Sequence, residues 1–168
     1  MTRTLRAGMT ALALTASVAC SSGTTGPSDL TSTGSSKATV NVAVRPSPIT
    51  ATRCNPQCPS QSGSGSFAFS VDMTIDVQNT ASVGATVNSI TLNATADSTT
   101  FAPLTFSSDD IKQQAGTTHV DGQTTLSIPL TIVYNTPSGR ANLSVSVSVQ
   151  VTDDRSNQVT ATGQTSVL

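Results

Sequence analysis

Two cysteines, Cys54 and Cys58, lie four positions apart in the segment RCNPQC. Thiols at this spacing could bind a metal ion, form a redox-active pair or close a small disulfide loop. Zinc would need further ligands, and the only histidine, His119, lies far along the chain. A redox pair of the Cys-x-x-Cys type has two intervening residues, whereas three intervene here. The cysteines by themselves leave a disulfide, a metal site and free thiols as alternatives.

The sequence holds few residues that could form a catalytic site. Acyl transfer needs a nucleophile, a histidine and a carboxylate in contact. His119 lies in the polar segment GTTHVDG beside a turn, where we expect an exposed loop histidine. Sugar hydrolysis needs two placed carboxylates. Asp72 and Asp76 would share the outward face of one strand, where we expect them to keep that face in water. We therefore predict no catalytic residues and no enzymatic activity.

Two pairs of adjacent aspartates, Asp109–Asp110 and Asp153–Asp154, could contribute to a Ca²⁺ site. Neither pair has the spaced Asp, Asn or Glu ligands that such a site requires. Helix capping and turn formation explain the two pairs better. We therefore predict no metal site and no cofactor.

The composition favours strands over helices. About a third of the 168 residues are Ser or Thr, and all nine acidic residues are Asp. Charged residues make up 10% of the chain, yet no run of about 18 apolar residues is present to span a bilayer. The net charge of −1 and the lack of any Lys/Arg cluster argue against nucleic acid as a partner.

Strict alternation of apolar and polar residues is the clearest pattern in the chain. It runs through SFAFSVDMTIDVQ (66–78), TLSIPLTIVY (125–134) and ANLSVSVSVQV (141–151). A period of two predicts strands with one buried face and one face in water. Phe67, Phe69 and Tyr134 fall on the inward faces, so we expect them to pack in the core rather than stack on sugars.

Weaker patterns supply the remaining elements. Residues 38–44 and 158–167 are predicted strands, and 85–96 is a strand with a bulge near Asn88–Ser89. Pro103 divides 99–106 into a short edge segment. The segment SSDDIKQQAG (107–116) offers a serine cap and a closing glycine, which predict one helical turn.

The first twenty residues have the features of an export signal. Arg3 and Arg6 precede a short apolar stretch that ends at Ala19, before Cys20. Ordinary signal peptidase could cleave after the small residues that end at Ala19. Alternatively, TASVAC resembles the lipobox of bacterial lipoproteins, although Ser17 stands where Leu is usual. That resemblance implies a lipid attached to Cys20, and Ser21 after it implies forwarding to the outer membrane.

A Ser/Thr/Gly-rich tract follows Cys20 and favours lipidation, because a tethered domain needs a spacer. The expected organisation is a lipoprotein signal peptide at 1–19, a flexible tether at 20–37 and one globular domain at 38–168. Such a chain would be exported and anchored in the cell envelope, at the periplasmic or surface face of the outer membrane.

The domain at 38–168 is predicted to be all-β, an antiparallel sandwich of about seven strands, because strands follow one another without alternating helices. It resembles the immunoglobulin-like modules of bacterial surface proteins, chiefly through LSVSVSVQVTDDRSNQVTATG (143–163), a strand, a turn and a returning strand. The tryptophan and the sheet-bridging cysteines of antibody domains are missing.

Export places the remaining cysteines in an oxidising compartment, where neighbouring thiols pair. If lipidation occupies Cys20, Cys54 and Cys58 are left as an even pair, so a local disulfide becomes the favoured prediction. The predicted function is that of a membrane-anchored envelope lipoprotein with a non-catalytic binding or adhesion module. Its partners would be the membrane, through the lipid, and an unspecified protein. The alternative is a structural spacer without a ligand.

Overall fold

The alternating segments form β-strands, as their period of two predicts. The computed structural model describes residues 37–59 and 66–168, so the expected signal peptide at 1–19, Cys20 and all of the expected tether except Lys37 lie outside them. Within the described residues lie ten strands and one helix: β1 (Val40–Arg45), β2 (Thr52–Pro59), β3 (Ser66–Asn79), β4 (Ala85–Ala96), β5 (Thr99–Thr100), β6 (Leu104–Ser107), α1 (Ser108–Ala115), β7 (His119–Val120), β8 (Thr125–Tyr134), β9 (Leu143–Asp153) and β10 (Gln158–Val167).

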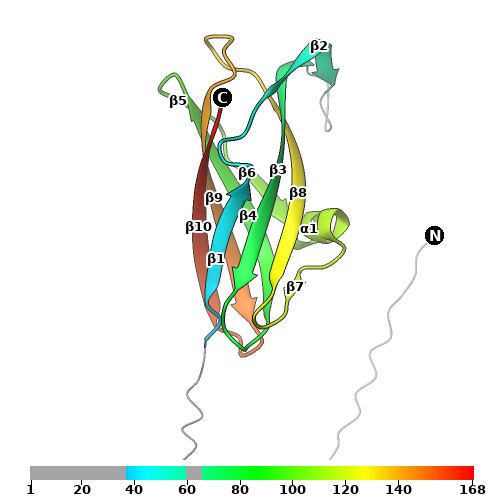
Figure 1. Cartoon of the computed structure of the whole chain (residues 1–168), viewed down its shortest axis with the longest axis vertical. Helices are drawn as coiled ribbons and strands as arrows, with labels where there is room; N and C mark the ends of the chain where they lie inside the picture. The colour runs from blue at the N-terminus through cyan, green and yellow to red at the C-terminus, as the bar shows by residue number, and fades with distance from the viewer. Residues whose placement is uncertain (1–36, 60–65) are drawn as a thin grey trace, which may run out of the picture. The chain divides into compact units, whose positions relative to one another are not determined.

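The strands form two antiparallel sheets that face each other (Figure 1). In the first sheet, β3 pairs with β8 on one side and with β1 and β2 on the other. In the second sheet the order is β10, β9, β4, and the short strands β5, β6 and β7 pair with the outer edge of β4. The prediction of an all-β fold, an antiparallel β-sandwich, is confirmed. Seven of the strands have six or more residues, and the three short ones were not predicted as separate strands.

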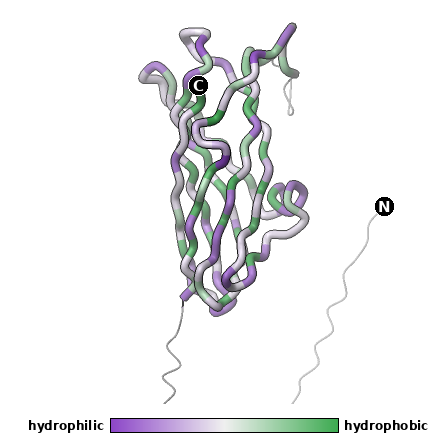
Figure 2. The backbone as a smooth tube through the Cα atoms, in the orientation of Figure 1, coloured by the Kyte–Doolittle hydropathy of each residue, from purple (hydrophilic) through white to green (hydrophobic). Residues whose placement is uncertain are grey.

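The core lies between the sheets, where the inward residues of the long strands meet. Over most of β3, β8 and β9, every second residue is apolar, and Figure 2 colours these strands by the hydropathy of their residues. Nearly all of these apolar side chains are buried. In β9 the buried set is complete: Leu143, Val145, Val147, Val149 and Val151. Full burial of one such side chain contributes roughly 1.5–3 kcal/mol, so the alternation accounts for most of the driving force for folding.

The predicted bulge in β4 is present. The pairing of β4 with β9 shifts register between Val87 and Ser89, so Asn88 is the extra residue. Because of this shift, Val87 and Ile90 both face the core although three positions separate them. A strand without the bulge would have turned one of them to solvent.

One long side of the sandwich is closed. After β1, the chain leaves the first sheet and joins the second, where Ile49 pairs in parallel with Val167 of β10. The Ile49 amide donates to the Ser166 carbonyl over 2.8 Å. A Cβ at Gly163 would lie 3.0 Å from the Val42 carbonyl oxygen, so the strands β1 and β10 approach closely here.

The other long side, between β8 and β6, is covered in part by α1, which packs against β8, β6 and β4. Ser107 caps the helix in a capping box with Asp110, and hydrogen bonds from Ser107 lower the pKa of that carboxyl. Ile111 is the buried residue of the helix. The helix has eight residues rather than the single turn predicted. Asp110 belongs to its cap, and Asp109 lies beside it in the first turn. No helix within the described residues is long and apolar enough to cross a membrane.

Cys54 and Cys58 are joined by a disulfide, with their Cα atoms 5.3 Å apart. Both cysteines lie within β2 rather than in a loop between strands. Arg53 pairs with Phe69 of β3 and Cys58 pairs with Phe67, so β2 carries three extra residues between these two positions. The disulfide closes this bulge at its base. By the loop-entropy relation, closing so short a loop contributes at most about 2 kcal/mol.

Candidate binding site between the two sheets

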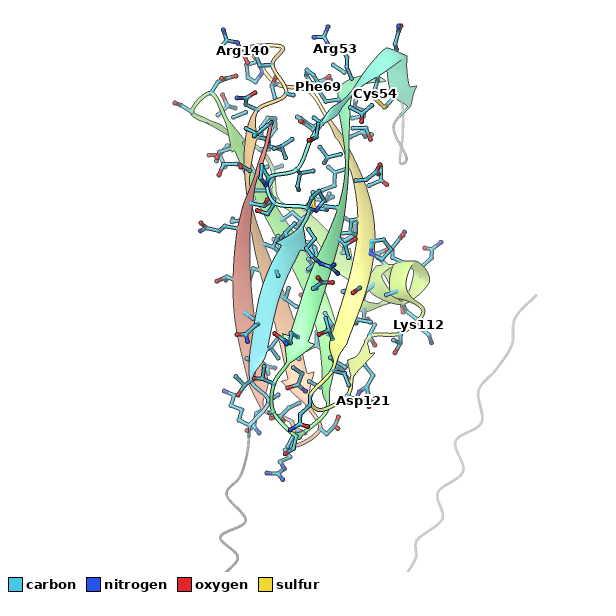
Figure 3. The ribbon with its side chains drawn as sticks, viewed as in Figure 1. Arg53, Cys54, Phe69, Lys112, Asp121 and Arg140 are labelled. Atoms are coloured by element: carbon cyan, nitrogen blue, oxygen red, sulfur yellow. A yellow bond between two sulfur atoms is a disulfide. The ribbon has the colours of Figure 1, made fainter. Side chains whose placement is uncertain are left out.

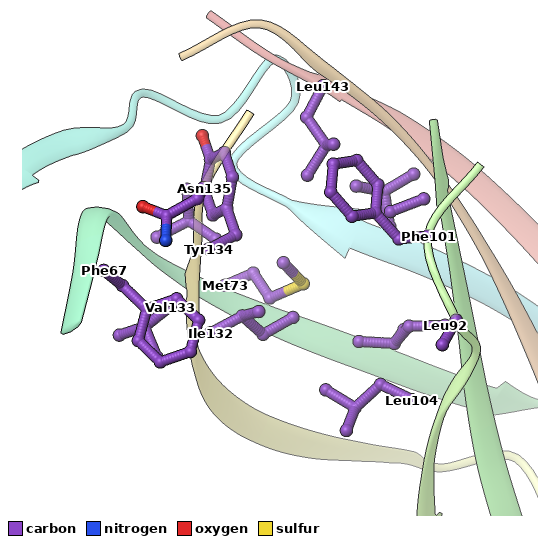
Figure 4. A pocket seen from close by; sticks show the side chains of 14 residues that line it. Phe67, Met73, Leu92, Phe101, Leu104, Ile132, Val133, Tyr134, Asn135 and Leu143 are labelled. Atoms are coloured by element: carbon purple, nitrogen blue, oxygen red, sulfur yellow. The ribbon is translucent and has the colours of Figure 1, made fainter. Parts of the chain in front are cut away.

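A cavity of about 370 Å³ lies between the inner faces of the two sheets (Figure 4). It is at the end of the sandwich where β2 pairs with the beginning of β3, and where the β4–β5 turn and the loop 135–142 lie. We call this the distal end. The proximal end is the opposite one, where Ala38 leads into β1. One wall comes from the first sheet, with Phe67 and Met73 of β3 and Ile132 and Tyr134 of β8.

The opposite wall comes from the second sheet and from the segment that follows β5. Leu92 of β4 and Leu143 of β9 form its buried part, whereas Phe101 and Leu104 lie beside Pro103. Leu104 lines the cavity and is 44% exposed, so it lies at the opening. The opening exists because β5 has only two residues that pair with β4. The chain then leaves the edge of β4 and pairs with β4 again only in β6.

The polar groups in the cavity wall already have partners within the protein. The Tyr134 hydroxyl donates to the Ala141 carbonyl over 2.6 Å, and burial raises the pKa of Tyr134 to about 12. The Asn135 side-chain oxygen accepts a hydrogen bond of 2.7 Å from the Ala68 amide. Among the described residues, those that line the cavity carry no charge. The site therefore offers apolar surface and fixed polar groups.

Contacts behind the wall hold the Tyr134 ring in place. The ring stacks on Phe69 with centroids 5.5 Å apart. The Arg53 guanidinium lies 5.5 Å from the Phe69 centroid, and Figure 3 labels both of these residues. Phe69 and Tyr134 are buried, as predicted. Phe67 is only partly buried because it lies beside the cavity, which the alternating pattern did not indicate.

His119 lies at the proximal end, away from the cavity, and in β7 rather than in a loop. Its Nε2 is 3.4 Å from an Asp121 carboxylate oxygen, its Nδ1 is 4.0 Å from Asp154, and the Thr86 hydroxyl is 3.5 Å from Nδ1. This set of residue types could activate a hydroxyl in a closed site. Here the histidine side chain is 42% exposed and the residues belong to strand ends and turns.

The remaining aspartates have structural partners. Asp72 is exposed and accepts a hydrogen bond from Thr131. Asp76 was expected in water, but it is buried by its pairing with Arg45 of β1 and Ser127 of β8. The hydrogen bond from Arg45 lowers the pKa of Asp76 most, desolvation opposes it and Ser127 adds to the lowering.

The side chains of Asp153 and Asp154 have different surroundings. Asp153 is buried where β9 ends, before the β9–β10 turn, whereas Asp154 faces His119. In the described parts of the chain, no three His, Cys or Asp side chains gather in a way that could hold a metal ion.

Comparisons with known proteins show similarity of fold. No protein-family model matches the sequence, and no curated protein matches it. The solved structure of the structural-genomics target SoR45 is 12% identical, with 76% of this chain and 85% of that chain covered and a TM-score of 0.53. The putative ApaA protein from Bordetella pertussis is 10% identical, with 77% and 92% covered and a TM-score of 0.53. A CARDB domain from the Pyrococcus furiosus protein PF1109 is 10% identical, with 78% and 89% covered and a TM-score of 0.41. The chain is thus distantly similar, in fold, to small β-sandwich domains.

Proposed function

We propose that the chain is an exported, lipid-anchored envelope protein whose β-sandwich is a non-catalytic binding module. The observation that carries the binding role is the apolar cavity between the sheets, open at the distal end. A domain that served only as a spacer would gain stability by filling such a space, because unfilled apolar volume in a core costs free energy.

The position of the chain's attachment supports the same proposal. Ala38, where the sandwich begins, is fixed at the proximal end by a hydrogen bond from its amide to Asp153. The chain that precedes Ala38 therefore joins the sandwich at the end opposite the opening of the cavity. The disulfide between Cys54 and Cys58 suits an oxidising compartment outside the cytoplasm.

Replacing Cys20 by serine should remove the anchor. The unmodified chain should carry acyl groups on an N-terminal Cys20 and sediment with membranes. The Cys20→Ser chain should lack the added mass and appear in the soluble fraction, because anchoring needs the acyl chains. Intact-mass spectrometry and cell fractionation check both points.

The double variant Cys54→Ser, Cys58→Ser is the matched control, since it removes two cysteines and should stay in the membrane fraction. Mature protein that begins at an unmodified Cys20 would contradict the lipid anchor.

The binding role can be tested in intact cells with a photo-reactive amino acid at Leu104, in the opening of the cavity. We expect illumination to give a reproducible adduct at this position. The same amino acid at Thr160, exposed on β10, should give none. Equal yields of adduct at the two positions, or no adduct at either, would favour the spacer and contradict the binding module.

A further inference from the structure

We propose that the cavity binds one unbranched hydrocarbon chain, the acyl or alkyl part of an amphiphile whose head group stays outside. This inference rests on the proposed function, because it names the ligand class of the same site. The shape of the cavity, the chemistry of its walls and the strand edges beside it each support this class.

The size of the cavity suits a single chain. A buried apolar cavity of about 150 Å³ holds benzene, a molecule of six carbons. On that scale, the 370 Å³ between the sheets has room for roughly 10–15 carbons. The walls belong to the facing sheets, so a ligand between them would contact protein on two sides.

The chemistry of the walls favours a ligand without polar groups in its buried part. The Tyr134 hydroxyl already donates a hydrogen bond to the Ala141 carbonyl, and the Asn135 side-chain oxygen already accepts one from the Ala68 amide. A polar ligand would lose its hydrogen bonds to water and find no charged partner among the described lining residues. A hydrocarbon chain makes no hydrogen bonds to water, so it loses none when it enters the cavity. The flexible side chain of Met73 can adjust to its width.

The opening suits an amphiphile that enters by its tail. Leu104 is exposed, and Phe67 and Val133 are half-buried, although all three line the cavity. These side chains would gain burial when a chain occupies the space beside them. Nearer the proximal end, Ile111 of α1 fills the core. The head group would remain in solvent near the opening.

The edge of β8 disfavours a different ligand, an extended peptide that would pair with β8 as an added strand. Pro129 lacks an amide hydrogen and interrupts donation along β8. Beyond it, only Ile132, Val133 and Tyr134 of β8 line the cavity, fewer residues than the five or six of a typical strand. A peptide, or a second copy of this chain, would gain few backbone hydrogen bonds here.

A chain-length series tests the inference. The full chain carrying Cys20→Ser would be titrated in a calorimeter with alkanoates and alkan-1-ols of about six to sixteen carbons, below micelle formation. We expect one site per molecule and a Kd that tightens about fourfold per added CH₂. The gain should stop at roughly 10–15 carbons, and both head groups should give the same trend.

Ala94→Leu is the variant that fills the cavity, because Ala94 lies in its wall on β4. It should weaken binding of a chain of about twelve carbons at least tenfold. Ala43→Leu adds the same side chain on the exposed face of β1 and should leave binding unchanged.

Three results would overturn the inference. One is a Kd that does not depend on chain length. Another is sedimentation with phosphatidylcholine vesicles without binding of monomeric chains, since the ligand would then be a membrane surface. The third is a dimer that buries Leu104 and excludes the chains. An unmodified Cys20 would contradict the anchor but leave the titration result standing, so the two failures can be told apart.

Discussion

Replacing Gly122 by alanine should lower the midpoint of thermal unfolding by about 10 °C. A Cβ at this position would lie 2.5 Å from both the carbonyl carbon and the carbonyl oxygen of Ser82, and backbone atoms cannot rotate away. The turn before β8 and the loop after β3 are also joined there, because the Gln123 amide donates to Ala81 and the Asn79 amide to Thr124. Relieving the clash would separate the two segments and stretch these hydrogen bonds.

Gly139→Ala is the control for the loss of glycine itself. Gly139 has a φ of +68°, which alanine adopts with strain, but nothing lies within 4 Å of its missing Cβ. We expect its effect on the unfolding midpoint to be less than half that of Gly122→Ala, since left-handed strain costs only about 1 kcal/mol. Equal effects of the two variants, measured by circular dichroism melts, would show that the contact with Ser82 does not matter.

Removing the Asp153 carboxylate should lower the unfolding midpoint by about 5–10 °C at neutral pH. Asp153 is 3% exposed and accepts hydrogen bonds from the Ala38, Arg155 and Asn157 amides and from the Asn157 side chain. Asp153→Ala would leave these donors without their acceptor. It would also detach the beginning of the sandwich from the β9–β10 turn.

The pH dependence gives a second test of Asp153. Burial raises the pKa of this carboxyl, but hydrogen bonds from the Asn157 side chain and from three backbone amides outweigh it and hold the pKa at about 2. The ionised group therefore stabilises the fold fully above its ordinary pKa near 4. This contribution is lost as the pH falls through about 2.

The difference in unfolding midpoint between the unmodified protein and Asp153→Ala should shrink between about pH 4 and pH 2. Asp154→Ala, at the exposed neighbouring position, should shift the midpoint by no more than about 2 °C at neutral pH. A difference for Asp153→Ala that is as large at pH 2 as at pH 7 would contradict the role of its charge.

The long strands could be predicted because alternation is a local property. In β3, β8 and β9 each inward residue is separated from the next by one outward residue, which is polar in most cases, and the pattern alone defines the buried face. The bulge at Asn88 was predictable for the same reason, since Val87 is out of phase with Ile90. Ser107 and Gly116 bound α1 because capping also depends on residues close in sequence.

Features that depend on distant segments were not predictable. Asp76 is buried because Arg45 and Ser127 come from the two flanking strands, and nothing near it in sequence indicates either partner. RCNPQC lacks the alternating pattern of the long strands, yet β3 provides a pairing edge for it. Tertiary pairing overrode the local preference.

The cavity was missed for a related reason. Alternation identifies residues that point inward, but it does not say whether side chains from the two sheets meet. Phe67 follows the pattern as well as the buried residues do, and it still lies beside open space. A signal was present at Pro103, which limits β5 and β6 to short strands and leaves the second sheet narrow beside the cavity.

The path of β1 has a mechanical consequence. The strand begins at the proximal end, is hydrogen-bonded to β3 along its length and continues through Ile49 and Ala51 onto β10. Inter-strand hydrogen bonds of an antiparallel pair run perpendicular to the strands. A force between Ala38 and the distal end would act along β1 and load these bonds together, in shear, rather than peel them apart one by one. The sandwich would resist a pull in this direction better than a pull that opens a hairpin at its end.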